Sequence, residues 1–498
     1  MPRPAWFGLL PFLGHGRPHE EPEVQGLVIT GGGAKASFQI GALRYLYGHE
    51  HIAPSVITTT SAGSILGALL AQFEDPAEQE AALHRIEDLW MSMQTSADMF
   101  TERSWFSRLL AHQHILDALR EAEGRRPGGA HRTRARHWAP WRTDDEGDGP
   151  RAAAERLERL APQERTLALA MAEEPGEPME FNANLVYRLL SGLPRFGRIG
   201  SDLAAALRGL ERNRSLYRPG PLLERLLSRD FFCSELVGAS GIAFRCAFVG
   251  LNSGELRYMR EDGRIVDRED RPLDGPGFDV TMGTLASCSV PGVFKPVEMN
   301  GEWYIDGGIR ENVPIEAAVK NLGVTRPYVI VSSPPGTIPD PKAGEGDILS
   351  ILFRVESIRA DESERDEIAY ARAAGATVIE PEVPVHDSMT IDPGLLTINR
   401  DYGWIRAAEA VGEASCELQA AHREIIRTRL RAWRLEKAAL ERDPRILDAG
   451  PGPVPELAET KEALRAMIGR ADASCLPAGH EEWWSRFERH PDAGAAHV

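Results

Sequence analysis

Ser61 stands where an apolar, β-branched run gives way to a segment with helical spacing. Residues 56–60 are predicted to form a buried strand, and apolar residues recur over 65–70 as on one face of a helix. A serine at such a corner is held clear of both elements, near the positive end of the helix dipole, where an oxyanion is favoured. This setting predicts nucleophilic attack. The usual elbow reads G-x-S-x-G, whereas this chain has Thr59 at the first glycine.

A run of glycines, Gly31, Gly32 and Gly33, lies between a predicted strand over 24–30 and a predicted helix over about 37–47. Backbone amides with no Cβ beside them can approach an anion, and a helix N-terminus favours negative charge. The anion is either a phosphate, because the loose dinucleotide pattern G-x-G-x-x-A is present, or the oxyanion of a tetrahedral acyl intermediate. A dinucleotide site expects an acid about twenty residues later, which this chain lacks, so the nearby serine favours the oxyanion. A tight turn before a helix is the third interpretation.

Asp306 follows a predicted strand over 303–305 and precedes two glycines, which places a carboxylate at the rim of a sheet. Alone it is typical of a turn, and this interpretation loses weight only when Asp306 is considered together with Ser61 and the glycine run. The order Ser61, Asp306, His386 also matches the triad order of α/β-hydrolases. We favour the pair without the histidine, because the chain has less predicted sheet before the serine than that fold provides. His386 is then expected in a surface loop.

Charge and composition exclude several classes of protein. The 498 residues carry a net charge of −17, which argues against general nucleic-acid binding and against non-specific attraction to an anionic membrane. No apolar run reaches about 18 residues, so no transmembrane helix is predicted. The short apolar stretch 6–12 lacks a cleavage site and is interpreted as a disordered tail, with an interfacial anchor as the alternative.

The five cysteines are widely spaced and form no C-x-x-C pair, which indicates a reducing compartment and no zinc site. Cys288 is expected to be a buried structural thiol, because no activating base adjoins it in the sequence.

The chain changes character over about 75–229, between the candidate residues. A mobile loop is predicted there over 125–150, and helices are predicted over 78–93, 152–171, 181–191 and 201–212. These residues form no convincing catalytic set, so we interpret the stretch as an insertion or cap over a core. The core resumes with a strand over 243–250 and a returning strand over 256–259. After residue 403 a long apolar helical face predicts helices that pack on the core or pair with another subunit.

Three motifs occur in order along the chain: T-G-G-G-A-K at 30–35, T-S-A-G at 60–63 and I-D-G-G at 305–308. In that order and setting they resemble the motifs of patatin-like phospholipases. The resemblance covers about 25–98 and 215–412. Supporting similarities are found at 215–227, 286–294, 329–332 and 401–404.

The resemblance implies a three-layer α/β/α sandwich with a mostly parallel central sheet, a largely helical insertion and a helical C-terminal extension. It divides the chain into an N-terminal tail (1–24), a catalytic domain (25–412) interrupted by the insertion (99–214), and the extension (413–498).

The resemblance also implies a role for each candidate residue. Ser61 attacks the ester carbonyl, and Asp306 accepts its proton and later activates water. Lys35 orders the glycine loop or attracts a phosphate headgroup, and hydrolysis needs no metal and no cofactor. The oxyanion hole is implied to consist of the amides of Gly31, Gly32 and Gly33.

The expected function is therefore hydrolysis of carboxylic esters in phospholipids or lysophospholipids by a serine esterase of the phospholipase A type. The expected partner is the lipid substrate, with transient contact to a membrane surface and none to nucleic acid. The expected location is cytoplasmic or peripheral at a membrane, without a signal peptide. Two alternatives stay open. Thr59 in the elbow, with Ala36 in place of a glycine, fits a family member that binds lipid without catalysis, and the glycine loop alone fits a nucleotide-binding protein.

Overall fold

A computed structural model gives the architecture of the chain. The predicted loop over 125–150, the predicted helices over 181–191 and 201–212, and nearly all of the predicted tail lie outside the described residues. The structure describes residues 23–104, 106–107, 157–172, 214–337, 339, 341, 343–345, 348–443, 445 and 454–491.

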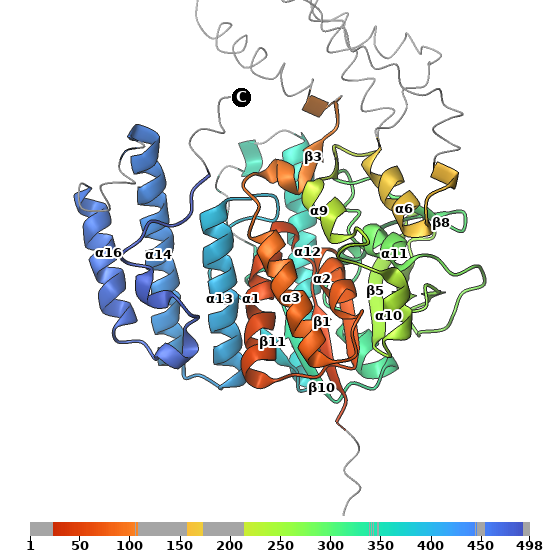
Figure 1. Cartoon of the computed structure of the whole chain (residues 1–498), viewed down its shortest axis with the longest axis horizontal. Helices are drawn as coiled ribbons and strands as arrows, with labels where there is room; N and C mark the ends of the chain where they lie inside the picture. Colours follow the sequence, from red (N-terminus) through yellow and green to blue (C-terminus); the bar gives the residue numbers. More distant parts are fainter. Residues whose placement is uncertain are drawn as a thin grey trace, which may run out of the picture.

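A nine-stranded mixed sheet forms the centre of the molecule (Figure 1). Its main path runs β11–β10–β1–β2–β5–β6–β7, and all pairings from β11 to β5 are parallel. The strands on the far side of β5 are antiparallel to their neighbours. The strands are β1 (Gln25–Ile29), β2 (Val56–Thr60), β5 (Ala243–Gly250), β6 (Leu256–Arg260), β7 (Ile265–Val266), β8 (Val297–Met299), β9 (Glu302–Asp306), β10 (Arg326–Ile330) and β11 (Thr377–Ile379).

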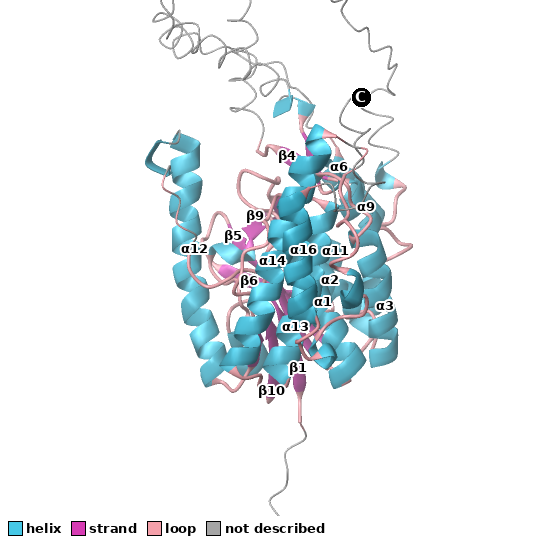
Figure 2. Cartoon of the chain, turned by 90° about the vertical axis from the view of Figure 1, so that its left-hand side faces the viewer, coloured by secondary structure: helices cyan, strands magenta, loops and turns pink. Residues whose placement is uncertain are grey.

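Helices cover both faces of this sheet. They are α1 (Ala36–Tyr45), α2 (Ala62–Leu70), α3 (Pro76–Trp90), α6 (Pro162–Met171), α9 (Pro221–Leu226), α10 (Ser234–Ala239), α11 (Val280–Ser287), α12 (Ile348–Ala373), α13 (Pro393–Val411), α14 (Cys416–Arg442) and α16 (Pro455–Ile468). Figure 2 shows α12 on one side of the strands and α1, α2 and α3 on the other.

Alternation along β1 explains the two helical layers. Leu27 and Ile29 belong to the large core that includes α1, α2 and α13. Val28 points to the opposite face, into a second core with Ile368 and Ala371 of α12. Because successive side chains of a strand point to opposite faces, a fully buried strand needs a helical layer on each side. The predicted α/β/α sandwich with a mostly parallel sheet is confirmed.

The order of pairings along β5 brings two distant strand ends together. One edge of β5 pairs with β2 as far as Ala247, which lies opposite Thr60. From Phe248 onward β5 pairs with β9, and Phe248 lies opposite Asp306. The other edge of β5 is paired with β6 over these residues. β9 therefore pairs with the same edge of β5 as β2 does, beyond the point where β2 ends. The first residue after β2 and the last residue of β9 therefore meet.

A second, two-stranded sheet was not anticipated from the sequence. β3 (Phe100–Glu102) pairs with β4 (Tyr217–Pro219), so the two ends of the predicted insertion over 99–214 lie side by side. Within that stretch α6 (Pro162–Met171) matches the C-terminal part of the helix predicted over 152–171, and residues 152–156 of that prediction lie outside the described residues. The division of the chain at 99, 214 and 413 stays a prediction.

The C-terminal helices form a further layer beside α13. α14 packs against both α13 and α16, and the three helices follow one another away from the sheet (Figure 1). Within the described ranges, no helix has the length and apolar character needed to cross a bilayer.

Candidate active site

Ser61 forms a strained corner between β2 and α2. Its backbone angles are φ 53° and ψ −131°, a region that residues with a side chain rarely adopt. The neighbouring groups hold this conformation. The amide of Ser61 donates to Ser287 Oγ at 2.9 Å, and its carbonyl accepts from the Cys288 thiol at 3.0 Å. Backbone strain of this kind persists only where the surroundings impose it, and it collects at functional sites.

Thr59 is accommodated in the elbow by a hydrogen-bond network and a glycine. Its hydroxyl lies 3.1 Å from Ser64 Oγ, which in turn lies 2.8 Å from Ser287 Oγ. Its methyl group packs against Gly67 of α2, where an added Cβ would lie only 2.3 Å from Thr59 Cγ2. The absence of a side chain at Gly67 thus provides the space that the branched side chain of Thr59 requires.

Asp306 ends β9 directly beside this corner. Its side chain is 5% exposed, and Oδ1 accepts from the amide of Gly308 at 2.8 Å. Oδ2 is buried and receives no hydrogen bond of standard geometry within the part of the chain that the structure describes. Burial raises the pKa of Asp306 to about 6, while the nearby Ser61 hydroxyl and the Gly308 amide favour the ionised form. A carboxylate with this pKa is suited to accept a proton near neutral pH.

The glycine loop lies against the serine. A Cβ on Gly31 would lie 2.8 Å from Ser61 Cβ, so only glycine permits this approach. The amide of Gly31 donates to Asn312 Oδ1 at 3.0 Å. Gly32 and Gly33 lead into a short 3₁₀ turn that continues as α1, and no hydrogen bond from their amides is found among the described residues. Two amides at a helix start thus remain to bind an anion.

Lys35 holds the loop from the far side. Its Nζ donates to Ser333 Oγ, and its carbonyl accepts from the Asn399 side chain at 3.3 Å. Burial lowers the pKa of Lys35, and the carboxylates of Glu364 and Asp387 partly oppose this. The contacts of its ammonium group fit a role in ordering the loop.

These groups share one cavity of about 570 Å³, which Ser61, Asp306 and all three glycines line. Most of the remaining lining is apolar and includes Ile65, Trp90, Met99, Phe100, Leu216, Leu223, Val293 and Phe294. A mainly apolar cavity with a few convergent polar groups is typical of a binding site for a small organic ligand.

A family model described as patatin-like phospholipase matches residues 27–147 and 165–319, which is more than half of the chain. The chain belongs to the patatin-like phospholipase family. The general activity that this indicates is lipid hydrolysis. No curated protein matches the chain.

Two solved structures with low sequence identity are similar to the chain. VipD from Legionella pneumophila is 14% identical, with a TM-score of 0.32, and the match covers 93% of this chain and 92% of that one. A chain of the heterodimeric ExoU–SpcU complex from the type III secretion system of Pseudomonas aeruginosa is 15% identical, with a TM-score of 0.20, and the match covers 93% and 68%.

His386 takes no part in this patatin-like site. It lies in a loop, as predicted, but is half-buried rather than at the surface. Its Nδ1 lies 2.8 Å from the carbonyl of Asp387, and the ring lines a different cavity, of about 530 Å³, together with Lys35. The arrangement gives no support to a triad with Asp306.

Cys288 fits the predicted structural role. Burial and the carboxylate of Asp306 raise the pKa of its thiol well above the ordinary value, so the thiol stays neutral. A neutral thiol is a poor nucleophile.

Two carboxylates of α12, which were not predicted from the sequence, support the loop after Asp306. Asn312 Nδ2 donates to Glu364 at 2.8 Å, and the amide of Asn312 donates to Glu367 at 3.0 Å. Burial raises the pKa of Glu367 to about 8 and also raises that of Glu364. Asn312 thereby connects α12 to Gly31. From the sequence alone, acidic residues on a long helix that support a loop cannot be distinguished from acidic residues on a solvent-exposed face.

The described part of the chain contains no group of three or more side chains arranged to hold a metal ion.

Proposed function

We propose that the chain hydrolyses carboxylic esters of phospholipids or lysophospholipids through a Ser61–Asp306 dyad. One observation carries the proposal: Ser61, with its strained backbone, and the buried carboxylate of Asp306 line the same mainly apolar cavity. A serine nucleophile needs an adjacent base, and Asp306 is the carboxylate that β9 brings to the end of β2.

In the first step Ser61 Oγ attacks the ester carbonyl carbon while Asp306 accepts the hydroxyl proton. The tetrahedral intermediate collapses to an acyl-serine, and the leaving alcohol takes the proton from Asp306. Asp306 then accepts a proton from water, whose oxygen attacks the acyl carbon. The second tetrahedral intermediate collapses, the bond to Ser61 Oγ breaks, and Asp306 returns the proton to Ser61 Oγ as the fatty acid is released. A carboxylate whose pKa is about 6 can serve in both half-reactions.

The amides of Gly32 and Gly33 are assigned as the donors to the oxyanion. The resemblance implied three donors, including the amide of Gly31. Gly31 donates its amide to Asn312, and this bond holds the loop against Ser61. Preorganised donors aimed at developing charge contribute about 3–4 kcal/mol each to lowering a barrier. Lys35 is assigned to ordering the loop, because its ammonium group is bound to Ser333.

The proposed partners follow from this chemistry. The substrate is a lipid at a membrane surface, which the protein contacts transiently. A cytoplasmic location, or one peripheral at a membrane, stays part of the proposal.

Release of fatty acid from mixed phospholipid and lysophospholipid vesicles tests the dyad. We expect Ser61→Ala and Asp306→Asn each to lower kcat by at least about 10³-fold, with no effect of a chelator on the wild type. Ser485→Ala and Asp274→Asn, which change exposed side chains, are the matched controls and are expected to retain full activity. Turnover that survives in either dyad variant would contradict the proposal. A folded wild type that binds the vesicles without turnover would favour the inactive family member.

A further inference from the structure

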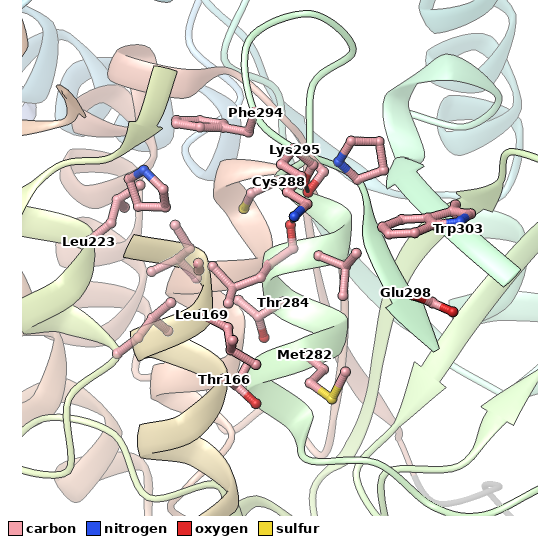
Figure 3. A pocket seen from close by; sticks show the side chains of 18 of the residues that line it. Thr166, Leu169, Leu223, Met282, Thr284, Cys288, Phe294, Lys295, Glu298 and Trp303 are labelled. Carbon is pink, nitrogen blue, oxygen red and sulfur yellow. Dashed lines mark hydrogen bonds between the residues drawn. The ribbon is translucent and has the colours of Figure 1, made fainter. Parts of the chain in front are cut away.

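A third cavity lies directly beside the proposed catalytic one. It has a volume of about 360 Å³ and lies between α6 and α11 (Figure 3). In that view Phe294 and Cys288 lie at one end, and Thr166 and Met282 lie at the other. We call it the rear chamber.

Four side chains form a common wall between the two cavities. Ile65, Leu223, Cys288 and Phe294 line both of them. Ile65 lies about one helical turn after Ser61 on α2, and the thiol of Cys288 donates to the carbonyl of Ser61. The rear chamber therefore begins immediately behind the nucleophile.

The lining of the rear chamber suits a hydrocarbon. Much of it is apolar: Leu169 and Ala170 from α6, Met282 and Leu285 from α11, and Pro219, Leu227 and Val297 from other segments. Binding of an apolar ligand in such a cavity is favourable, and the binding free energy becomes more negative in proportion to the apolar surface removed from water.

Four polar side chains of this lining already donate hydrogen bonds within the protein. Thr166 and Thr284 donate their hydroxyl protons to carbonyls of their own helices, at 2.9 and 3.0 Å. Ser289 donates to the carbonyl of Leu285 at 2.8 Å, and the guanidinium of Arg103 donates to Ser215 Oγ, also at 2.8 Å. A polar ligand would find these groups occupied. The lining also includes Lys295 and the exposed Glu298, which gives the chamber a hydrophilic border.

We propose that the rear chamber takes the distal part of the acyl chain whose ester carbonyl lies at Ser61. This inference rests on the proposed function and specifies its substrate: esters of long-chain fatty acids. The chain passes the common wall beside Phe294, whose ring stacks on Phe100 with a centroid distance of 5.8 Å. Helix α6, from the segment predicted to be an insertion, then sets the length of chain that fits.

Hydrolysis of p-nitrophenyl esters of increasing chain length tests the assignment. Each additional methylene that reaches an apolar site is expected to raise kcat/KM about fourfold, until the chamber is full. Ala170→Phe places a ring in the chamber, so it should lower kcat/KM for the longest esters at least tenfold and leave the four-carbon ester unchanged. Met282→Ala, which enlarges the chamber from α11, should move the optimum to longer chains.

Ala168→Phe is the matched control, because it makes the same change on the same helix at a position that does not line the chamber. The inference is overturned if both phenylalanine variants keep the wild-type chain-length profile and Met282→Ala leaves the optimum unmoved.

A second measurement does not depend on turnover. Ser61→Ala protein is incubated with a palmitic acid that carries a photoreactive diazirine near its methyl end, and the labelled residues are mapped by mass spectrometry. Labelling of α6 and α11 supports the chamber, and labelling confined to other segments overturns it. If the wild type cleaves no ester of any length while α6 and α11 are labelled, then the proposed hydrolysis fails and the acyl site stands.

Discussion

At the scale of single residues, opposing effects set the charge state of Asp306. Burial among apolar side chains disfavours the carboxylate, whereas the Ser61 hydroxyl and the Gly308 amide favour it. The result is a pKa of about 6, above the ordinary value for aspartate. A base with this pKa is ionised at neutral pH and still holds a transferred proton well enough to return it to a leaving group.

This charge state predicts an acidic limb in the pH profile of kcat/KM. Protonated Asp306 cannot accept the Ser61 proton, so activity should be full well above pH 6 and fall about tenfold for each pH unit below it. Hydrolysis of a short-chain ester in buffers of constant ionic strength gives the profile. Histidine titrates in the same range, so His386→Ala is the control and should keep the limb in place. A limb that disappears in His386→Ala would assign the base to the histidine instead.

The two dyad residues can be recognised in the sequence, because Ser61 directly follows a strand and Asp306 ends one. The support behind them carries no such mark. Asn312 bonds to Glu364 across 52 positions in the chain, and that contact exists only because α12 packs on the sheet. Likewise, the hydrogen bond from the Gly31 amide to Asn312 depends on the position of Asn312, which a glycine motif does not predict.

At the scale of elements, close packing of α2 on β2 explains how the unusual elbow is tolerated. Gly67 lets the helix backbone approach Thr59 and Ile57, whose methyl groups would lie 2.3 and 3.1 Å from an added Cβ. Thr59 is visible in the sequence as a departure from G-x-S-x-G. Gly67, which makes room for Thr59, lies in the following helix, and the strand-to-helix pattern of the sequence does not predict this contact.

This packing predicts that Thr59 and Gly67 are energetically coupled. Gly67→Ala should lower the free energy of unfolding by about 1–3 kcal/mol, because the new methyl group overpacks a filled site. Thr59→Ser keeps the hydroxyl and removes the methyl group, so Gly67→Ala should cost much less in that background. Urea unfolding of the four proteins of the double-mutant cycle measures the coupling. Equal costs of Gly67→Ala in both backgrounds would show that the contact is not the cause.

At the scale of the whole molecule, the sandwich followed from the family resemblance, and the helices after residue 403 followed from their apolar spacing. The way those helices attach could not be predicted. Arg429 of α14 is buried and joins two distant carboxylates, with Asp401 of α13 at 2.7 Å and Glu488 at 3.0 Å. Its guanidinium also lies 4.0 Å from the centroid of the Trp483 ring. In the sequence, this arginine is one of several charged residues along a helix.

Because Arg429 is buried between two carboxylates, we expect its side chain to contribute strongly to the attachment of the C-terminal layer. Arg429→Met keeps most of the volume but leaves buried Glu488 without its cation and leaves Asp401 paired with Arg400 alone, which should cost about 3–5 kcal/mol of unfolding free energy. Arg427→Met, two residues away, removes an exposed ion pair with Glu424 and should cost less than about 1 kcal/mol. Thermal and urea unfolding of the two variants measure this difference. Equal losses would mean that water or rearrangement compensates the buried carboxylates, whereas the expected gap would show that α13, α14 and the segment around Glu488 are held together by charge as well as by apolar packing.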